Sequence, residues 1–324
     1  MSDQRFLIVR LGSLGDVVHA IPAVAALRAR HPGARIDWIV DPRYADLVGL
    51  VDGVDRVIPF DPRAGWGLLL TTARQLRRER YDAAIDLQGL IKSAVLARAA
   101  GARRTIGFAR ADLREPLASI LYTETHDSGH VSHVIHKGLA LMRATGVEQT
   151  AVAFPLRLPA AKPGGYVLIN PGAAWPNKRW PPERFGELAA AIRERHGLRS
   201  VVLWGPGEES AAATVAAASR GAAELAPLTS ITDIVAIAKG ASLMVSGDTG
   251  PLHIAAAVGT PIVALFGPTR AERNGPWSPS DISLTRFDHC VCHYERRCRR
   301  GSPCIDDIVV DDVIAAVERR LAAR

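Results

Sequence analysis

Short apolar runs alternate with helix-like segments along almost the whole chain, and this alternation restricts the fold more than any other feature. In the first half, runs typical of buried strands lie at residues 6–11, 35–40, 56–61, 83–88 and 104–108. In the second half they recur at residues 166–172, 200–205, 243–248 and 261–267. The segments between them space their apolar residues along one helix face. The alternation predicts an α/β protein with parallel sheets covered by helices on both faces.

A Pro/Gly-rich stretch at residues 146–165 interrupts the alternation and marks the expected domain boundary. We expect a Rossmann-like domain at 1–155 and a second one at 156–324, whose last helix can also pack back on the first domain. Two doubly wound domains are expected to leave a cleft between them. Ligands in this architecture bind outside the carboxyl ends of the strands, so site residues should follow strands and face that cleft.

The charge balance favours an anionic partner. The 324 residues carry a net charge of +7, which suits phosphates or acidic lipid head groups. Aromatic residues are not interleaved with the basic clusters, so nucleic acid is not expected as a partner. The N-terminal apolar run is too short for a secretory signal, and no other run is long enough to cross a bilayer. We therefore expect a cytoplasmic protein that can touch a membrane surface.

The segment "RLGSLGD" at residues 10–16 follows the first predicted strand and is the first candidate site. Gly12 and Gly15 permit a tight turn and the close approach of a ligand. Asp16 stands at a predicted helix start, where capping and catalysis are equally good interpretations. The segment lacks the third glycine of the dinucleotide fingerprint, which argues against a nicotinamide-dependent oxidoreductase.

A second candidate site lies in the segment "SGDTGPLHIAAAVG". A strand is expected to end at Asp248, and a helix to start near Pro251. The backbone N–H groups of Thr249 and Gly250 would then point out of the helix start, where an anion such as a phosphate binds readily. Alone, His253 could be a core histidine, but beside this helix start we favour a phosphate contact.

Two loops after strands of the second half add polar groups. Lys178 lies in "NPGAAWPNKRWP", and its place at a strand's carboxyl end favours a contact with the same anion over simple solvation. Glu208 follows the turn "LWGPG" and suits ribose hydroxyls or a base. Glu208 and Glu209 are equally well interpreted as first-turn acids that favour the helix dipole.

The first half also contains basic residues near predicted strand ends. Lys92 follows "IDLQGL", and Arg110 and Arg114 lie in "RTIGFARADLREPLAS". Together they could line the binding site of an acidic acceptor. Each of them alone is equally well interpreted as surface charge.

All four cysteines lie in "CVCHYERRCRRGSPC". The spacing is CxC followed by two intervals of five residues, which is not that of a zinc ribbon. Disulfides are disfavoured in a cytosolic protein. A loop with reduced thiols is the favoured interpretation, and a structural metal site formed by Cys290, Cys292, Cys298 and Cys304 is the alternative.

These motifs together resemble glycosyltransferase family 9, the lipopolysaccharide heptosyltransferases. "LGSLGDVVHAIPA", "IDLQGLIKSA" and "REPLAS" look like heptosyltransferase I, and "DTGPLHIAAAVGTPIVALFGPT" resembles the diphosphate motif of the whole family. The resemblance covers nearly the whole chain. It implies a GT-B fold of two Rossmann-like domains and an ADP-heptose donor. It also implies inverting transfer to a Kdo-bearing lipid A acceptor at the cytoplasmic face of the inner membrane.

The resemblance also implies roles for individual residues. By similarity, Asp16 is the catalytic base, Lys178 holds the donor diphosphate and Glu208 contacts the adenosine ribose. The remaining donor-binding residues are Asp248, Thr249, Gly250, Pro251 and His253. The acceptor-side positions are Arg10, Gly15, Lys92, Arg110 and Arg114.

Some features depart from heptosyltransferase I. Position 10 is Arg where Lys is more common, and Ala173 and Ala174 stand where hydroxyls tend to be offered to phosphate. "NPGAAWPNKRWP" and the cysteine-rich segment are more similar to heptosyltransferase II. Transfer onto a first heptose, or of another nucleotide sugar, is therefore an alternative. A noncatalytic nucleotide-sugar-binding module is a further one.

Chemistry without a metal ion or other cofactor is expected, because no "DxD" motif follows a predicted strand. Lys178, His253 and the helix start at Thr249 would instead neutralise the leaving diphosphate. Asp16 would take the proton of the acceptor hydroxyl while the hydroxyl oxygen attacks the anomeric carbon.

Overall fold

The chain folds into two compact units, which we describe from a computed structural model covering residues 4–148, 150–158 and 164–323. The division between the units falls between Arg157 and Leu158. The boundary expected from the sequence lies two residues earlier. No helix within these described ranges has the length and apolarity needed to cross a membrane.

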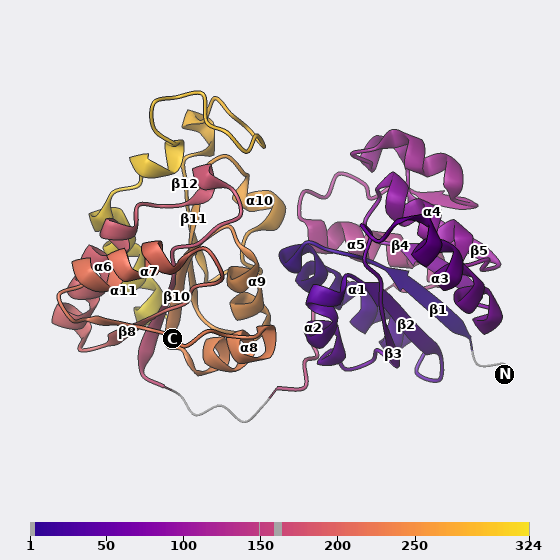
Figure 1. The fold of residues 1–324 in the computed structure, drawn as a ribbon, viewed down its shortest axis with the longest axis horizontal. Helices are drawn as coiled ribbons and strands as arrows, with labels where there is room; N and C mark the ends of the chain where they lie inside the picture. The colour runs from indigo at the N-terminus through magenta and orange to yellow at the C-terminus, as the bar shows by residue number, and fades with distance from the viewer. Residues whose placement is uncertain (1–3, 149, 159–163, 324) are drawn as a thin grey trace. The chain divides into compact units, whose positions relative to one another are not determined.

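The first unit is built around one parallel sheet (Figure 1). Its strands are β1 (Arg5–Val9), β2 (Arg35–Val40), β3 (Arg56–Pro59), β4 (Ala83–Asp86), β5 (Arg104–Phe108) and β6 (Glu124–His126). Its helices are α1 (Leu14–Arg30), α2 (Ala45–Gly49), α3 (Gly65–Glu79), α4 (Ile91–Ala99) and α5 (Val134–Met142). Short 3-10 turns are η1 (Pro42–Tyr44), η2 (Arg110–Asp112), η3 (Pro116–Leu121) and η4 (Arg143–Thr145). The strand order is β3-β2-β1-β4-β5-β6.

The second unit repeats this architecture. Its strands are β7 (Tyr166–Asn170), β8 (Arg199–Val202), β9 (Ala223–Leu225), β10 (Leu243–Gly247), β11 (Ile262–Phe266) and β12 (Ile282–Thr285). Its helices are α6 (Pro182–His196), α7 (Glu209–Ala218), α8 (Ile231–Gly240), α9 (Gly250–Ala257), α10 (Ala271–Asn274) and α11 (Val310–Ala322). Its 3-10 turns are η5 (Pro176–Lys178), η6 (Phe287–His289) and η7 (Cys304–Asp307). The strand order, β12-β11-β10-β7-β8-β9, is the order of the first sheet read from the other end.

Helices cover both faces of the second sheet, which explains its continuous apolar strands. Figure 1 shows α6, α7 and α11 on one face and α8 and α9 on the other. Strand β11 is buried along its whole length, as expected for a parallel strand between two helical layers. The apolar side of α11 packs against α6, β11 and β12 of its own unit. The predicted α/β class with two doubly wound Rossmann-like halves is confirmed.

Each sheet reverses its strand order at one point, and this point positions the candidate site. In the first sheet β1 lies beside β4, with Val9 paired to Asp86. In the second sheet β7 lies beside β10, with Asn170 paired to Ser246. In doubly wound sheets the loops that follow such a pair of strands diverge to opposite faces, and ligands bind there, at the carboxyl ends of the strands.

Three strands, the helices α5 and α10, and the short 3-10 turns were not predicted from the sequence. The strands β6, β9 and β12 have only three or four residues each. They lie at the edges of their sheets. Helix α5 packs against α1 with its buried face. The edge strands lack the long apolar runs that identify central strands, because only one neighbour pairs with them.

Candidate functional site

Asp16 lies in the first turn of α1, directly after the loop that follows β1. Its Oδ2 accepts hydrogen bonds from the backbone N of Ser13 at 3.0 Å and from the Ser13 hydroxyl at 3.1 Å. Its Oδ1 lies 2.7 Å from Nη2 of Arg10. The side chain nevertheless keeps 38% of its surface exposed. Asp16 therefore caps the start of the helix, as the capping interpretation expects. Its carboxylate is also accessible to a substrate, which a catalytic role requires.

Arg10 connects the loops on the two sides of the reversal point in the first sheet. Besides its ion pair with Asp16, its Nη1 donates a hydrogen bond to the carbonyl oxygen of Leu87, after β4. The backbone N of Leu11 donates to Oε1 of Gln88 at 2.8 Å. Arg10, which was predicted on the acceptor side, thus contacts the carboxylate of Asp16 and holds that side chain in place.

Gly12 leaves room for the ring of Tyr44, a residue that the sequence did not single out. A Cβ at this position would lie 2.7 Å from a ring carbon of Tyr44. Within the described chain this close approach is made by Tyr44, and the approach of a ligand to the loop stays a prediction. Burial raises the pKa of Tyr44, and the negative charges of Asp41 and Asp16 add to the rise. Gly15, the second glycine of the motif, is buried within α1.

Asp248 is the centre of a buried polar network at the end of β10. Its Oδ2 accepts from Nζ of Lys178 at 2.5 Å and from the Thr269 hydroxyl at 2.8 Å. Its Oδ1 accepts from Nδ2 of Asn274 at 2.7 Å and lies 3.3 Å from Nε2 of His253. Burial alone would raise the pKa of Asp248, but the hydrogen bond with His253 and the Lys178 ammonium hold it well below its usual range. Asp248 is therefore an ionised group that orients two predicted donor-binding side chains.

The start of α9 lies beside this network. Thr249 is the N-cap residue, and its hydroxyl contacts Nδ2 of Asn170 at 3.1 Å. The Asn170 amide also donates to Ser246 Oγ at 3.1 Å, which joins the ends of β7 and β10. Gly250 is the first helical residue, and Pro251 follows it without an N–H group. Pro251 can therefore shape an anion site at this helix start but cannot donate a hydrogen bond to the anion.

The loop that carries Lys178 is pressed against the end of β10. A Cβ on Gly247 would lie 2.7 Å from the carbonyl oxygen of Lys178, so only glycine allows this approach. The Lys178 ammonium also lies 4.6 Å from the centre of the Trp175 ring, within the range of a cation–π contact. The Lys178 side chain is only 14% exposed, and its ammonium contacts both Asp248 and the ring of Trp175.

Glu208 bends over the loop that follows β7. A Cβ on Gly172 would meet its carboxylate at 2.1 Å, and the backbone N of Gly205 donates to its Oε2 at 3.0 Å. Glu208 is the N-cap residue of α7, and Glu209 lies in the first turn. Glu208 and Glu209 therefore differ, because the carboxylate of Glu208 folds back toward the strand ends whereas Glu209 is an acid of the first helical turn.

The three other predicted acceptor residues lie on elements that contact one another. Lys92 is exposed at the start of α4, Arg110 in η2, and Arg114 in the loop before η3. Turn η3 packs against both α4 and η2. The backbone N of Ile91 donates to Oε2 of Glu115 at 2.7 Å, which ties the start of α4 to this loop. The side chains of the three basic residues are free to face solvent.

The cysteine-rich segment forms a cluster of four free thiols. Cys290, Cys292 and Cys304 are buried and Cys298 packs against them, with Sγ of Cys292 and Cys298 3.8 Å apart. Burial, followed by the neighbouring Cys290 thiol, raises the pKa of Cys304 to about 12. In the part of the chain that the structure describes, no three His, Cys, Asp or Glu side chains are arranged to hold a metal ion. The thiols pack as a small core beneath this loop.

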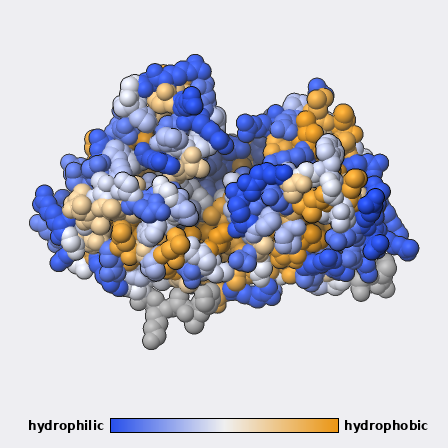
Figure 2. All heavy atoms as spheres, in the orientation of Figure 1, coloured by the Kyte–Doolittle hydropathy of each residue, from blue (hydrophilic) through white to orange (hydrophobic). Residues whose placement is uncertain are grey.

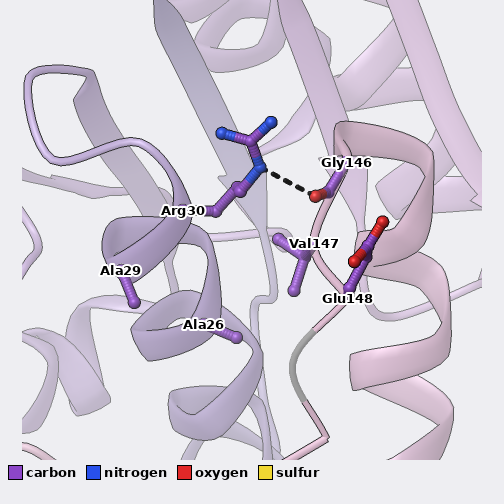
Figure 3. A pocket seen from close by; sticks show the side chains of 6 residues that line it. All are labelled: Ala26, Ala29, Arg30, Gly146, Val147 and Glu148. Atoms are coloured by element: carbon purple, nitrogen blue, oxygen red, sulfur yellow. Dashed lines mark hydrogen bonds between the residues drawn. The ribbon is translucent and has the colours of Figure 1, made fainter.

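A surface pocket on the first unit lies apart from all of these residues (Figure 3). It is bounded by α1 and the segment after η4, where Nε of Arg30 donates to the carbonyl oxygen of Gly146 at 2.9 Å. Its lining residues are Ala26, Ala29, Arg30, Gly146, Val147 and Glu148. No predicted site residue is among these described lining residues, so we do not assign the activity to this pocket.

Comparisons with known proteins identify the family and the fold of the chain. Residues 69–302 match the profile of glycosyltransferase family 9 (heptosyltransferase). The chain is 32% identical to lipopolysaccharide heptosyltransferase 1 of Pseudomonas aeruginosa over 91% of its own length and 87% of that protein. It is 31% identical to the Escherichia coli K12 protein of that name, over 82% and 88%.

Solved structures show the same fold. Escherichia coli heptosyltransferase WaaC with ADP is 27% identical, with a TM-score of 0.83 over 98% of this chain and all of that chain. Escherichia coli ADP-heptose lps heptosyltransferase II is 22% identical, with a TM-score of 0.80 over 99% of each chain, and supports the fold alone. The family match and the relatives above 30% identity lead to one conclusion: the chain belongs to glycosyltransferase family 9.

Proposed function

We propose that this protein transfers heptose from ADP-heptose to a Kdo-bearing lipid A acceptor during synthesis of the lipopolysaccharide core. Relatives named lipopolysaccharide heptosyltransferase 1 and the WaaC structure with ADP-2-deoxy-2-fluoro heptose support this reaction. The observation that carries it for this chain is the buried Asp248, which fixes Lys178 and His253 beside the start of α9.

The donor diphosphate binds at the carboxyl ends of β7 and β10 in this proposal. Lys178 provides a positive charge that its two neighbours hold in place. The N-terminus of α9 adds the partial positive charge of a helix start. Glu208, folded over the end of β7, is placed to accept hydrogen bonds from the adenosine ribose. These groups stabilise the charge that develops on the leaving ADP, so no metal ion is required.

Asp16 acts as the general base. Its accessible carboxylate takes the proton from an acceptor hydroxyl while the oxygen of that hydroxyl attacks the anomeric carbon and the bond to ADP breaks. A single displacement from the opposite side of the sugar ring inverts the anomeric configuration. Arg10 and Ser13 hold the carboxylate during this step.

The reaction takes place at the cytoplasmic face of the inner membrane in this proposal. A nucleotide-linked sugar is dissolved in water, whereas lipid A is anchored in a bilayer, so the enzyme has to work at the surface between them. The protein would therefore be peripheral, and its basic character suits phosphate-bearing lipids.

Product analysis by mass spectrometry tests this function. The purified protein is incubated with ADP-heptose and with acceptors that carry either Kdo alone or Kdo plus one heptose. We expect one heptose to be added to the first acceptor. Addition only to the second acceptor would establish the heptosyltransferase II-like alternative, which the Ala173–Ala174 loop favours. Binding of ADP-heptose without transfer to either acceptor would support the noncatalytic binding module.

A further inference from the structure

Exposed aliphatic side chains gather near the start of α4 and on turn η3. Leu117 is 58% exposed, Ile120 is 73% exposed and Ile91 is 40% exposed. Residues three apart in a 3-10 turn project from the same side, so Leu117 and Ile120 point in one direction. Figure 2 shows hydrophobic residues at the upper edge of the first unit, close to where Figure 1 labels α4. Large aliphatic groups that face water together indicate an interaction surface.

These side chains belong to one continuous surface. Turn η3 packs against α4, and the hydrogen bond from the backbone N of Ile91 to Glu115 Oε2 joins the two elements at 2.7 Å. On the inner side of η3, Ala118 is fully buried and Tyr122 donates to the buried carboxylate of Asp86 at 2.8 Å. The turn is therefore anchored from below, and its outer apolar residues are presented on a fixed support.

Basic side chains lie on or next to the elements that carry this apolar surface. Lys92 follows Ile91 directly, and Arg110 and Arg114 lie in η2 and in the loop that leads into η3. All three are exposed. Aliphatic groups combined with Lys and Arg are typical of surfaces that bind anionic membranes, because the apolar groups enter the interface while the cations contact lipid phosphates.

The surface begins at the edge of the sheet where Asp16 lies and extends toward the opposite edge, because Thr123, shortly after η3, donates to the carbonyl oxygen of Thr105 at the start of β5. Helix α4 follows the carboxyl end of β4, and η2 and η3 follow that of β5. Asp16 follows β1, which neighbours β4, and β5 is the next strand. With about 4.8 Å between neighbouring strands, the ends of β1 and β5 are roughly 10 Å apart. A lipid whose acyl chains remain in the bilayer could therefore present its sugar to Asp16.

We propose that the lipid-docking surface, formed by Ile91, Leu117 and Ile120 with their three basic neighbours, seats the first unit on a bilayer of anionic phospholipids. This inference rests on the proposed function, because it names the surface through which the enzyme reaches a lipid acceptor. A second copy of the chain fits the surface less well, because two identical basic rims would repel each other.

Vesicle co-sedimentation tests this proposal. Wild-type protein is expected to bind vesicles of phosphatidylglycerol and phosphatidylethanolamine, and to bind phosphatidylcholine vesicles weakly. The double variant Leu117→Ser/Ile120→Ser should bind the anionic vesicles at least about tenfold more weakly. Leu228→Ser is the matched control, because Leu228 is 64% exposed but belongs to the second unit. This control should bind like wild type.

Two acceptors separate docking from chemistry. With an acyl-free Kdo–glucosamine acceptor, the double variant should keep the wild-type kcat/KM, whereas with acceptor embedded in vesicles its rate should fall by the same factor as vesicle binding. Equal vesicle binding by wild type and double variant would overturn the proposal. The proposal would also fail if wild type formed a dimer and the substitutions dissociated it without changing vesicle binding. If anionic vesicles bind in the expected way but neither acceptor is glycosylated, the proposed function fails and the docking surface stands.

Discussion

Asp16 and Asp248 both lie at the point where the strand order of their sheet reverses, but their surroundings are opposite. Each follows a central strand of a parallel sheet and lies at the start of a helix. The Asp16 side chain is 38% exposed and contacts one guanidinium group and a serine. The Asp248 side chain is 5% exposed and is surrounded by Lys178 and three further polar side chains.

The difference shows how one residue type serves two purposes at similar positions. A carboxylate that has to take a proton from a substrate needs an accessible oxygen, which the surroundings of Asp16 provide. A carboxylate that is buried and fully hydrogen-bonded cannot approach a substrate, but it can fix the cations that do. A position after a central strand therefore identifies an aspartate as a candidate. The burial of its side chain then decides whether it can act on a substrate or can only position other groups.

Replacing Asp16 should have the largest effect on catalysis. Asp16→Asn keeps the shape of the side chain but removes the base, so we expect kcat to fall by about 10²–10⁴-fold. The rate is measured as ADP release under saturating donor and acceptor. Asp61→Asn is a suitable control, because Asp61 is also an aspartate of the first unit that pairs with an arginine, Arg63. A kcat within a factor of three of wild type for Asp16→Asn would show that Asp16 is only a helix cap.

Replacing Lys178 should have the next largest effect. Lys178→Met removes the ammonium near the leaving group, and we expect kcat to fall by roughly 10²–10³-fold, with weaker donor binding. Lys239→Met is the control, because Lys239 donates to a backbone carbonyl at the end of α9. Turnover by Lys178→Met close to that of the control would remove the ammonium from the mechanism.

Asp248→Asn should mainly lower stability. Because the ionised form is buried with its partners, we expect the free energy of unfolding at pH 7 to fall by about 3 kcal/mol. The native pKa of Asp248 lies below its ordinary value of 3.8, so its contribution is complete above that value and is lost as the pH falls further. Urea unfolding from pH 7 to pH 3 should show the difference from wild type shrinking only in the most acidic samples. A difference that grows on acidification would contradict the assigned charge.

Gly12→Ala tests the packing beside Asp16 with a smaller effect. The new methyl group would contact the ring of Tyr44, and we expect a loss of roughly 1–3 kcal/mol in the free energy of unfolding. Gly67 provides the matched control, because a Cβ placed there meets no described atom within 4 Å apart from its chain neighbours and the backbone of its own helix. Gly67→Ala should leave stability unchanged or raise it slightly, since Gly67 lies within α3. Equal stability of the two variants would show that Tyr44 moves freely.

A chelator should have the smallest effect. Because Lys178, His253 and the start of α9 are proposed to stabilise the leaving diphosphate, initial rates in excess EDTA should equal those in buffer. Rates are compared after dialysis against the chelator. Loss of activity that added Mg²⁺ restores would show that these side chains do not replace a metal ion.

The central part of the fold could be predicted from the sequence because buried parallel strands need continuous apolar runs. The runs at β1, β2, β10 and β11 are of this kind. The edge strand β6 reads Glu-Thr-His and has no such run, so no local signal identifies it. Its position depends on pairing with β5, which is a tertiary contact.

The candidate site could be predicted where residues directly follow central strands. The segments that contain Asp16, Lys178 and Asp248 follow the central strands β1, β7 and β10, and this order made the three residues candidates. Thr269 and Asn274 were missed as partners of Asp248, although Thr269 also follows a central strand, β11. Asn274 lies in the short helix α10, and only the folded chain brings its amide to within 2.7 Å of Asp248.

Calorimetric titration of ADP into Asp16→Asn and Asp248→Asn, side by side with wild type, tests the contrast between the two aspartates most directly. Asp16→Asn should bind ADP with the wild-type Kd, because its carboxylate acts only on the acceptor. Asp248→Asn should bind at least about tenfold more weakly, since Lys178 and His253 lose the group that positions them. Weakened ADP binding by Asp16→Asn together with wild-type binding by Asp248→Asn would contradict the account.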